Sequence, residues 1–342
     1  MYSENLLKHT DFLAVLQELE FTCLDIGARG GFTKDLYPMA FAVDAIGFEP
    51  EIAECQRLND LAAKSHHPWK SLKFLPVAIS GTGGMRNLHI TTHAGTASIL
   101  QPNVHIGKQY NRPQYFSVDE TRTVKTLTLD KALEAYDIDN PSFLKIDIEG
   151  AEFEVFRSAV NTLRYLLAIR TEVGFMDLRL NQPQFSDVDQ LLREKGFRLA
   201  RFIDTVYWRR TGSGNHHPHL AKGFIPYSQS EIAHSDALYL KTVDEINMND
   251  SGEVKKLLGS AFIACSYGLF DFAGSILLRE EVKKFLFEKY NINVERCLMS
   301  TSYLFYKDYL KKRIYSLPLQ AKQIIKQIKY FMYDVWVSAH RR

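Results

Sequence analysis

The segment FTCLDIGARGGF, residues 21–32, sets the architecture that the rest of the chain follows. Its first half is a short apolar run of the kind that forms a buried strand, and this run ends around Asp25. Its second half is a turn with glycines at positions 27, 30 and 31, where the backbone can turn tightly and approach a ligand closely. A strand that runs into such a turn predicts a nucleotide-like ligand here.

Outward from this segment, apolar runs of strand length alternate with helical patterns. This alternation predicts an α/β fold, in which a mostly parallel sheet is covered by helices on both faces. The predicted strands are FTCLDI, AVDAIGFE, LKFLPVAI, NLHITT, TVKTLTL, SFLKIDI, LLAIRTEV, FRLARFI and ALYLKT. The predicted helices are ENLLKHTDFLAVLQEL, EIAECQRLNDLAAK, KALEAYDI, EFEVFRSAVNTL and DVDQLLREKGF. Residues 81–123 contain scattered glycines and prolines, so we expect loops with one or two short strands there.

The alternation stops after Thr242, and only helical patterns follow. We therefore expect two units in the 342 residues, a catalytic domain over 1–245 and a helical extension over 246–342. The end of the extension, residues 311–342, has one acid, Asp334, and is otherwise strongly basic. Its positive residues are Lys311, Lys312, Arg313, Lys322, Lys326, Lys329, Arg341 and Arg342. A basic helix with an apolar stripe predicts either packing on the protein itself or contact with an anionic membrane surface or a partner protein.

Composition excludes several classes of protein. A hydrophobic content of 46% and a charged content of 24% are typical of a folded globular chain. No stretch is long and apolar enough for a membrane span, and the first residues lack an apolar signal core, so we expect a cytoplasmic protein. The four cysteines show no CxxC pairing, which argues against a disulfide framework or a zinc site.

A second motif, AIGFEPE, places Glu49 at the end of the next predicted strand. An acid at that position can accept both hydroxyls of a ribose, in dinucleotide sites and in adenosylmethionine sites alike. The dinucleotide fingerprint GxGxxG would need glycines where Arg29 and Phe32 stand, and no GxxxxGK[ST] loop is present. Asp25 followed by a glycine turn suits a ligand with an ammonium group and no phosphate.

The third motif, FLKIDIEGAEFEVF, has four acids where an apolar strand gives way to a helix. Strand alternation puts Lys145 and Asp147 on one face, with Glu149 at the open carboxyl end where α/β enzymes bind ligands. Glu152 and Glu154 are interpreted as acids that favour a helix N-terminus.

These pieces resemble the FkbM-type methyltransferases. The matching segments stand in the family's order: LDIGARGGF, GFEPE, PVAISGTGG, TLTLD, FLKIDIEGAEFEVF, RTEVGF and ALYLKT. They cover roughly residues 20 to 242, and the IDIEGAE block after a GFEP block is the most specific of them. Arg29 stands where the family usually has an asparagine, and the extension after residue 245 lies outside the resemblance.

The resemblance implies a class I methyltransferase fold with a seven-stranded sheet, S-adenosyl-L-methionine as the methyl donor, and transfer to a hydroxyl oxygen of a sugar, glycan or secondary metabolite. The resemblance also implies that the cofactor-binding residues are Asp25, Gly27, Ala28, Gly30, Glu49, Pro50, Ala78 and Ser80. Asp147, Glu149, Lys145 and Glu172 are the candidates for catalysis, and His93 and Thr96 for contact with the acceptor.

Several alternatives stay open. Asp147 and Glu172 could also hold a divalent metal, but no third ligand can be named, so we expect none. The other classes of function are a non-catalytic adenosylmethionine-binding or glycan-binding module and, with less support, a nicotinamide-dependent oxidoreductase. We expect a small-molecule or glycan acceptor and no nucleic acid, since no basic stripe crosses the catalytic region. The sequence does not indicate the oligomeric state.

Overall fold

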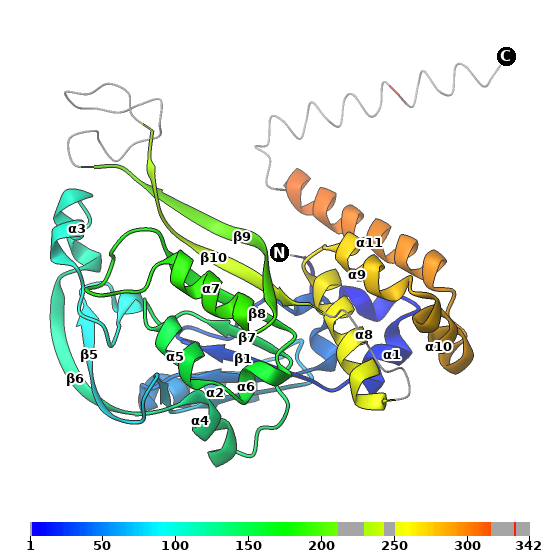
Figure 1. Cartoon of the computed structure of the whole chain (residues 1–342), viewed down its shortest axis with the longest axis horizontal. Coiled ribbons are helices and arrows are strands. Elements are labelled where there is room, and N and C mark those ends of the chain that lie inside the picture. The colour runs from blue at the N-terminus through cyan, green and yellow to red at the C-terminus, as the bar shows by residue number, and fades with distance from the viewer. Residues whose placement is uncertain (1, 211–228, 243–249, 316–331, 333–342) are drawn as a thin grey trace.

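The computed structural model describes residues 2–210, 229–242, 250–315 and 332. Its centre is a seven-stranded sheet in the order β3-β2-β1-β7-β8-β10-β9 (Figure 1). These strands are β1 (Phe21–Ile26), β2 (Val43–Phe48), β3 (Ser71–Leu75), β7 (Phe143–Ile146), β8 (Ala168–Gly174), β9 (Phe197–Trp208) and β10 (Glu231–Lys241). Strands β3, β2, β1, β7 and β8 are parallel, whereas β10 is antiparallel to both of its neighbours. The predicted α/β fold is confirmed.

The register of the sheet brings charged residues from three neighbouring strands into one row. Asp25 on β1 is paired with Lys145 on β7, and Lys145 is paired with Arg170 on β8. Residues paired across parallel strands share a face of the sheet, so these three side chains lie on the same face. They follow apolar residues of the same strands, such as Cys23 and Phe143, which are fully buried.

Two groups of helices cover the two faces. One face packs under α4 (Leu129–Ala135), α5 (Glu152–Ser158), α6 (Thr162–Tyr165) and α7 (Phe185–Glu194), around a core that contains Leu24, Ile146 and Phe156. The helix predicted over 152–163 is therefore interrupted, because residues 159–161 leave the helical path between α5 and α6. Helix α2 (Ile52–Lys64) buries Cys55 and Leu58 in a small cluster with Phe74 of β3.

The opposite face packs under elements from both ends of the chain. The N-terminal ones are η1 (Leu6–His9), α1 (Leu13–Glu18) and η2 (Tyr37–Ala42). The C-terminal ones are α8 (Ser251–Ser266), α9 (Phe270–Leu277), α10 (Glu280–Tyr290) and α11 (Val294–Tyr315). They share one apolar cluster, in which Phe12 of the N-terminal part and Phe262 of α8 contact each other edge to face. The boundary expected near residue 245 falls between the described residues, and the helices beyond it share this core.

The insert is more regular than the sequence suggested. A second sheet in the order β4-β6-β5 contains β4 (Ala78–Ile79), β5 (Gly84–Thr91) and β6 (Val118–Leu127). The loop between β5 and β6 carries η3 (Ala94–Thr96), α3 (Val104–Gln109) and η4 (Pro113–Tyr115). At most two short strands were expected over 81–123, and two are present, but they are longer than expected because β5 and β6 form an extended antiparallel ladder. Most side chains of β5 and β6 are at least partly exposed. Exposed strands contain fewer apolar residues, so the apolar content of the sequence underestimates the length of these two strands.

None of the described helices is long and apolar enough to cross a membrane. The helix predicted at residues 320–340 lies outside the described residues except for Met332, whereas Lys311, Lys312 and Arg313 of the basic segment belong to the end of α11.

Candidate active site

A cavity of about 520 Å³ opens between the carboxyl ends of β1 and β2 and the second sheet. Four of the residues predicted to bind the cofactor line it: Gly27, Glu49, Pro50 and Ala78. Asp147 and Glu149, which end β7, line its far side. The insert closes it with Leu88 and Ile90 of β5 and with apolar or small residues of the following loop. The cavity therefore lies where parallel α/β sheets bind their ligands.

Gly27 is a position where only glycine fits. Its φ is +86°, and an added β-carbon would lie 2.1 Å from the carbonyl oxygen of Asp147. The turn after β1 and the end of β7 thus touch through their backbones. This close approach brings the first motif and the third motif of the sequence to the same cavity.

Asp25 lies beneath that turn and is almost completely buried. Its Oδ2 accepts a hydrogen bond of 2.8 Å from the backbone N–H of Thr33, and its Oδ1 lies 3.3 Å from Lys145 Nζ. Burial raises the pKa of Asp25 to about 6, against the opposing effect of Lys145. The same ammonium group lies 3.5 Å from Oδ2 of Asp147, so Lys145 links the buried acid to one that lines the cavity.

Glu49 is also buried, and its Oε1 accepts a hydrogen bond of 2.9 Å from the backbone N–H of Glu51. Burial raises its pKa. Arg29, the residue that departs from the family pattern, lines the cavity and forms an ion pair of 3.0 Å with Glu51. A guanidinium at this rim partly neutralises the acids that end β2.

Besides Asp25 and Lys145, six predicted residues lie off the cavity lining: Ala28, Gly30, Ser80, His93, Thr96 and Glu172. Ala28 is buried in the cluster around Cys55, the N–H of Gly30 donates to Glu54, and Ser80 is buried with its hydroxyl bonded to Thr126. His93 is exposed, and its ring lies 5.1 Å from that of Tyr115. Thr96 points back to its own loop, but its carbonyl oxygen accepts a bond of 3.1 Å from Arg179.

Four acids gather at the ends of β7 and β8. Carboxylate oxygens of Asp147, Glu152 and Glu172 all lie within 4.8 Å of one another. Glu149, in a left-handed backbone conformation with φ of 60°, lies beside them and pairs with Arg179 at 2.7 Å. A residue of this type adopts such a conformation at an energetic cost, which is common at functional sites.

Asp147, Glu149, Glu152 and Glu172 form this acidic cluster, and the pKa values of its three glutamates are shifted by burial and by repulsion from neighbouring acids. Burial, with the charge of Glu172 next, raises the pKa of Glu152 to about 8 and that of Glu149 well above its usual value. Burial also raises the pKa of Glu172. Like charges this close in a buried site cannot all ionise, so the cluster binds protons at neutral pH.

Three members of the site were not predicted from the sequence as functional residues. His234 lies on β10, and its Nδ1 is 2.7 Å from Oε1 of Glu172. Burial works to lower the pKa of His234, but the bond to Glu172 and its charge raise the value overall. Arg179 comes from the loop after β8, and Glu152, interpreted as a helix acid, accepts bonds from the N–H groups of Ile148 and Gly150. The predicted strand ALYLKT begins too late to include His234, because β10 begins at Glu231. A predicted strand that started earlier is the only signal that could have indicated His234.

The structure supplies the third oxygen that a metal site would need, in Glu152, but the set fits a divalent cation poorly. Glu152 accepts two backbone N–H bonds, and Glu172 already has His234 as a partner. The raised pKa values favour protonated carboxyls, which are weak metal ligands. We therefore assign no step to a metal.

The sequence matches the methyltransferase FkbM domain model over residues 25–199, a little over half of the chain. The chain belongs to the FkbM methyltransferase family. The match begins at Asp25 and includes the glycine turn, Glu49 and the IDIEGAE block, which are the parts that meet at the cavity. Its sheet, with β10 antiparallel between β8 and β9, has the order of a class I methyltransferase.

Solved structures similar to this FkbM-family chain are distant. The FkbM methyltransferase of Methylobacillus flagellatus KT is 13% identical with a TM-score of 0.33, and the alignment covers 65% of this chain and 43% of that one. The magnesium protoporphyrin IX methyltransferase of Synechocystis PCC 6803, solved with bound SAM, is 10% identical with a TM-score of 0.33, covering 68% and 74%. A comparison with curated proteins finds no match.

Gly27→Ala should cost at least about 2 kcal/mol of stability and abolish binding at the cavity, because the methyl group would displace the end of β7. Gly30→Ala is the matched control, since Gly30 has a similar φ of +81° but no atom within 4 Å of an added β-carbon. Urea unfolding of both variants measures the difference. Equal losses would mean that backbone strain, not the contact with Asp147, requires the glycine.

Glu152→Gln should stabilise the protein at alkaline pH. The folded state keeps the proton of Glu152 up to about pH 8, whereas the unfolded chain releases it near 4.5, so wild-type stability falls as the pH rises between these values. Glutamine has no proton to lose, so the variant should gain on the order of 2 kcal/mol at alkaline pH and little in acid. Urea unfolding across this range tests it, and a gain that does not change with pH would contradict it.

Proposed function

We propose that this chain is an S-adenosyl-L-methionine-dependent methyltransferase that methylates a hydroxyl oxygen of a sugar, glycan or secondary metabolite. The observation that carries the proposal is the contact of Gly27 with the Asp147 backbone, which brings Glu49 and two acids of the cluster, Asp147 and Glu149, to one cavity. Family membership supports the reaction class. The hydroxyl acceptor is supported by the chemistry of the acids.

Binding of the cofactor would use the ends of the first two strands. Glu49, buried at the cavity wall, suits the ribose hydroxyls, and Ala78 lies where the adenine edge would rest. Asp147 and the buried Asp25, joined by Lys145, favour a positive group at the methionine end. When bound, the cofactor supplies an activated methyl group.

The acidic cluster suits a hydroxyl acceptor because methylation of an oxygen releases a proton. The acceptor oxygen forms a bond to the methyl carbon, the sulfur keeps the electron pair of the broken bond, and a carboxylate takes the hydroxyl proton. Asp147 and Glu149 both line the cavity and are the candidates for this base. Glu172 and His234, which contact each other beside these acids, would share the proton that the base takes up. Alignment of the methyl donor and the acceptor supplies the rest of the rate enhancement.

Two other functions keep less support. A non-catalytic adenosylmethionine-binding or glycan-binding module would use the same cavity, but it would not need several acids with raised pKa values at one sheet edge. A nicotinamide-dependent oxidoreductase would need a phosphate-binding turn, and Arg29 and Phe32 stand where its glycines belong. We also propose a cytoplasmic location and an acceptor other than nucleic acid.

Titration of the full chain with S-adenosylhomocysteine in a calorimeter tests the proposal. We expect micromolar binding that falls at least about tenfold in Glu49→Ala, which removes a carboxylate from the cavity wall, and in Asp25→Ala, which removes the buried partner of Lys145 beneath the glycine turn. Asp60→Ala, an exposed acid on α2, is the matched control and should bind like the wild type. No binding by folded wild-type protein would refute the methyltransferase assignment.

We further propose that the basic end of the chain contacts an anionic membrane surface. Lys311, Lys312 and Arg313 are exposed where α11 ends, and the chain continues with five more positive residues. Positive side chains and an apolar stripe together favour anionic bilayers.

Vesicles of phosphatidylcholine, with and without phosphatidylserine, test this membrane contact. The full chain should sediment with the anionic vesicles only, and a chain ending at residue 315 should stay in solution. Equal sedimentation of the two proteins would contradict the proposal.

A further inference from the structure

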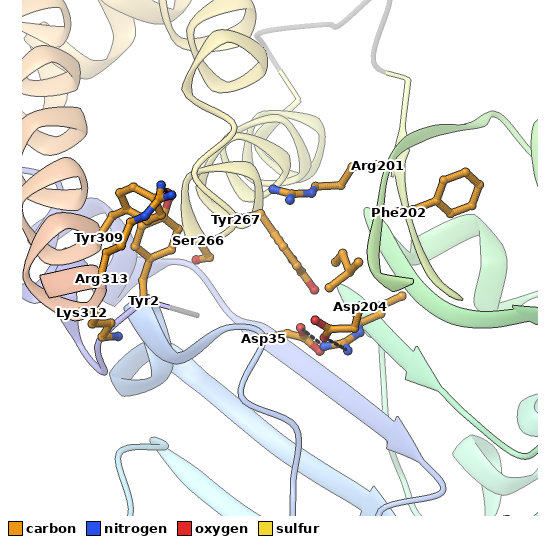
Figure 2. Close-up of a pocket in the computed structure, with 12 residues that line it drawn as sticks. Tyr2, Asp35, Arg201, Phe202, Asp204, Ser266, Tyr267, Tyr309, Lys312 and Arg313 are labelled. Carbon is orange, nitrogen blue, oxygen red and sulfur yellow. Dashed lines mark hydrogen bonds and ion pairs between the residues drawn. The ribbon is translucent and has the colours of Figure 1, made fainter. Parts of the chain in front are cut away.

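A second cavity, of about 610 Å³, lies between the sheet and the C-terminal helices (Figure 2). Its sheet side is formed by Arg170 of β8 and residues 201–204 of β9, and its helical side by the end of α8 and by α11. Tyr2 and Asp35 complete it from the N-terminal part of the chain. The cavity therefore exists only because the extension outside the matched family region packs on the same face of the sheet as Asp25 and Lys145.

One cation at this cavity has no acidic partner among the described residues. The side chain of Arg201 forms no ion pair or hydrogen bond within that part of the chain, and Figure 2 shows its guanidinium extending over the cavity. The hydroxyl of Tyr267 is shielded from solvent and points towards Asp35 and Asp204. An arginine without a carboxylate beside it can bind a phosphate or a carboxylate of a ligand.

The backbone at Asp204 is distorted in a way that affects the cavity. Asp204 has a φ of 53°, and the pairing of β9 with β10 skips a residue between Ile203 and Val206, which makes a β-bulge. Bulges of this kind redirect a side chain and are frequent beside active sites. The carboxylate of Asp204 is three-quarters exposed and lies 3.6 Å from Arg170.

The charges are arranged as an acidic floor and a basic rim. Arg170 joins Asp35, at 2.7 Å, and Asp236 into a buried network at the floor, with Asp204 at its edge. Arg201, Lys312 and Arg313 surround the opening, and Lys312 pairs with Asp308 at 3.3 Å. Carboxylates accept hydrogen bonds from sugar hydroxyls, and guanidinium groups bind phosphate or carboxylate.

Aromatic rings complete the recognition surface. Tyr2, Tyr267 and Tyr309 line the cavity. Figure 2 shows the ring of Phe202 pointing away from them, and this ring contacts those of Phe175 and Phe185. Tyrosine combines a flat apolar face with a polar hydroxyl, so it suits the apolar face of a sugar ring.

We propose that this cavity binds the acidic sugar part of the methyl acceptor, a sugar bearing a phosphate or a carboxylate; the proposal rests on the proposed function. Its floor is adjacent to the reaction site, because Arg170 is two residues before Glu172 on β8, about 7 Å along the strand. Asp236, the partner of Arg170, is paired with Glu172 across β10 and β8. A bound sugar would thus lie one row of side chains from the acidic cluster. The C-terminal helices supply the other wall of the acceptor site.

Calorimetry on the full chain, with and without saturating S-adenosylhomocysteine, tests this site. The probes are glucose 6-phosphate, glucuronate and glucose, so that the phosphate and carboxylate sources of the charge are measured separately. At least one charged sugar should bind, and glucose should bind at least about tenfold more weakly. Arg201→Ala should weaken binding of the charged sugar about tenfold, because it removes the cation that pairs with the phosphate or carboxylate. Asp204→Asn should also weaken binding, because it removes a carboxylate that accepts hydrogen bonds from the sugar hydroxyls.

Arg157→Ala, an exposed arginine on the other face of the sheet, is the matched control and should change nothing. Affinity for S-adenosylhomocysteine should be the same in all three variants, which shows that the cofactor cavity is intact. Charged sugars that bind no better than glucose, or equal losses in Arg201→Ala and Arg157→Ala, would overturn the acceptor site. Failure of S-adenosylhomocysteine to bind would instead refute the methyltransferase assignment, and the sugar titrations without it still report on the cavity.

Discussion

The buried ammonium group of Lys145 is the interaction on which the site depends. It lies between Asp25 on β1 and Asp147 at the end of β7, 3.3 Å and 3.5 Å away. Burial works against its charge, but the two carboxylates raise its pKa above the usual value, so it stays protonated. Two acids this close in a desolvated place would repel each other without that charge. With Lys145 between them, Asp147 can line the cavity while Asp25 stays buried beneath the glycine turn.

The same principle extends along the sheet. Arg170 follows Lys145 in the row and joins Asp35 and Asp236, so each of the two cations in the row is paired with a carboxylate from another segment of the chain. Burial raises the pKa values of Glu149, Glu152 and Glu172, although Arg179 lies beside Glu149 and His234 beside Glu172. A sheet edge that combines paired charges with acids of raised pKa can bind a cationic donor and, through an ionised carboxylate of the cluster, accept a proton within a short distance.

The C-terminal helices belong to this arrangement physically, although they lie beyond the family match. Their apolar residues share a core with η1, α1 and the sheet, and Ser3 near the N-terminus bonds Asp308 of α11 at 2.9 Å. The face of the sheet that carries the charged row is thus covered by both ends of the chain. Where the cover is incomplete, the second cavity forms, next to Arg170.

The sequence by itself determined the fold class, the cofactor motifs and most of the acidic cluster, because these depend on local patterns. Strand-length apolar runs, the turn at Gly27 and the acids of IDIEGAE each lie within a few consecutive residues. The insert was harder to predict, because the half-exposed strands β5 and β6 lack a clear apolar pattern. His234, Arg179 and the Arg170 network could not be found that way, since each joins the site through a contact with a residue distant in sequence. Only the tertiary structure decided those contacts, because the sheet register and the packing of the C-terminal helices bring the partners together.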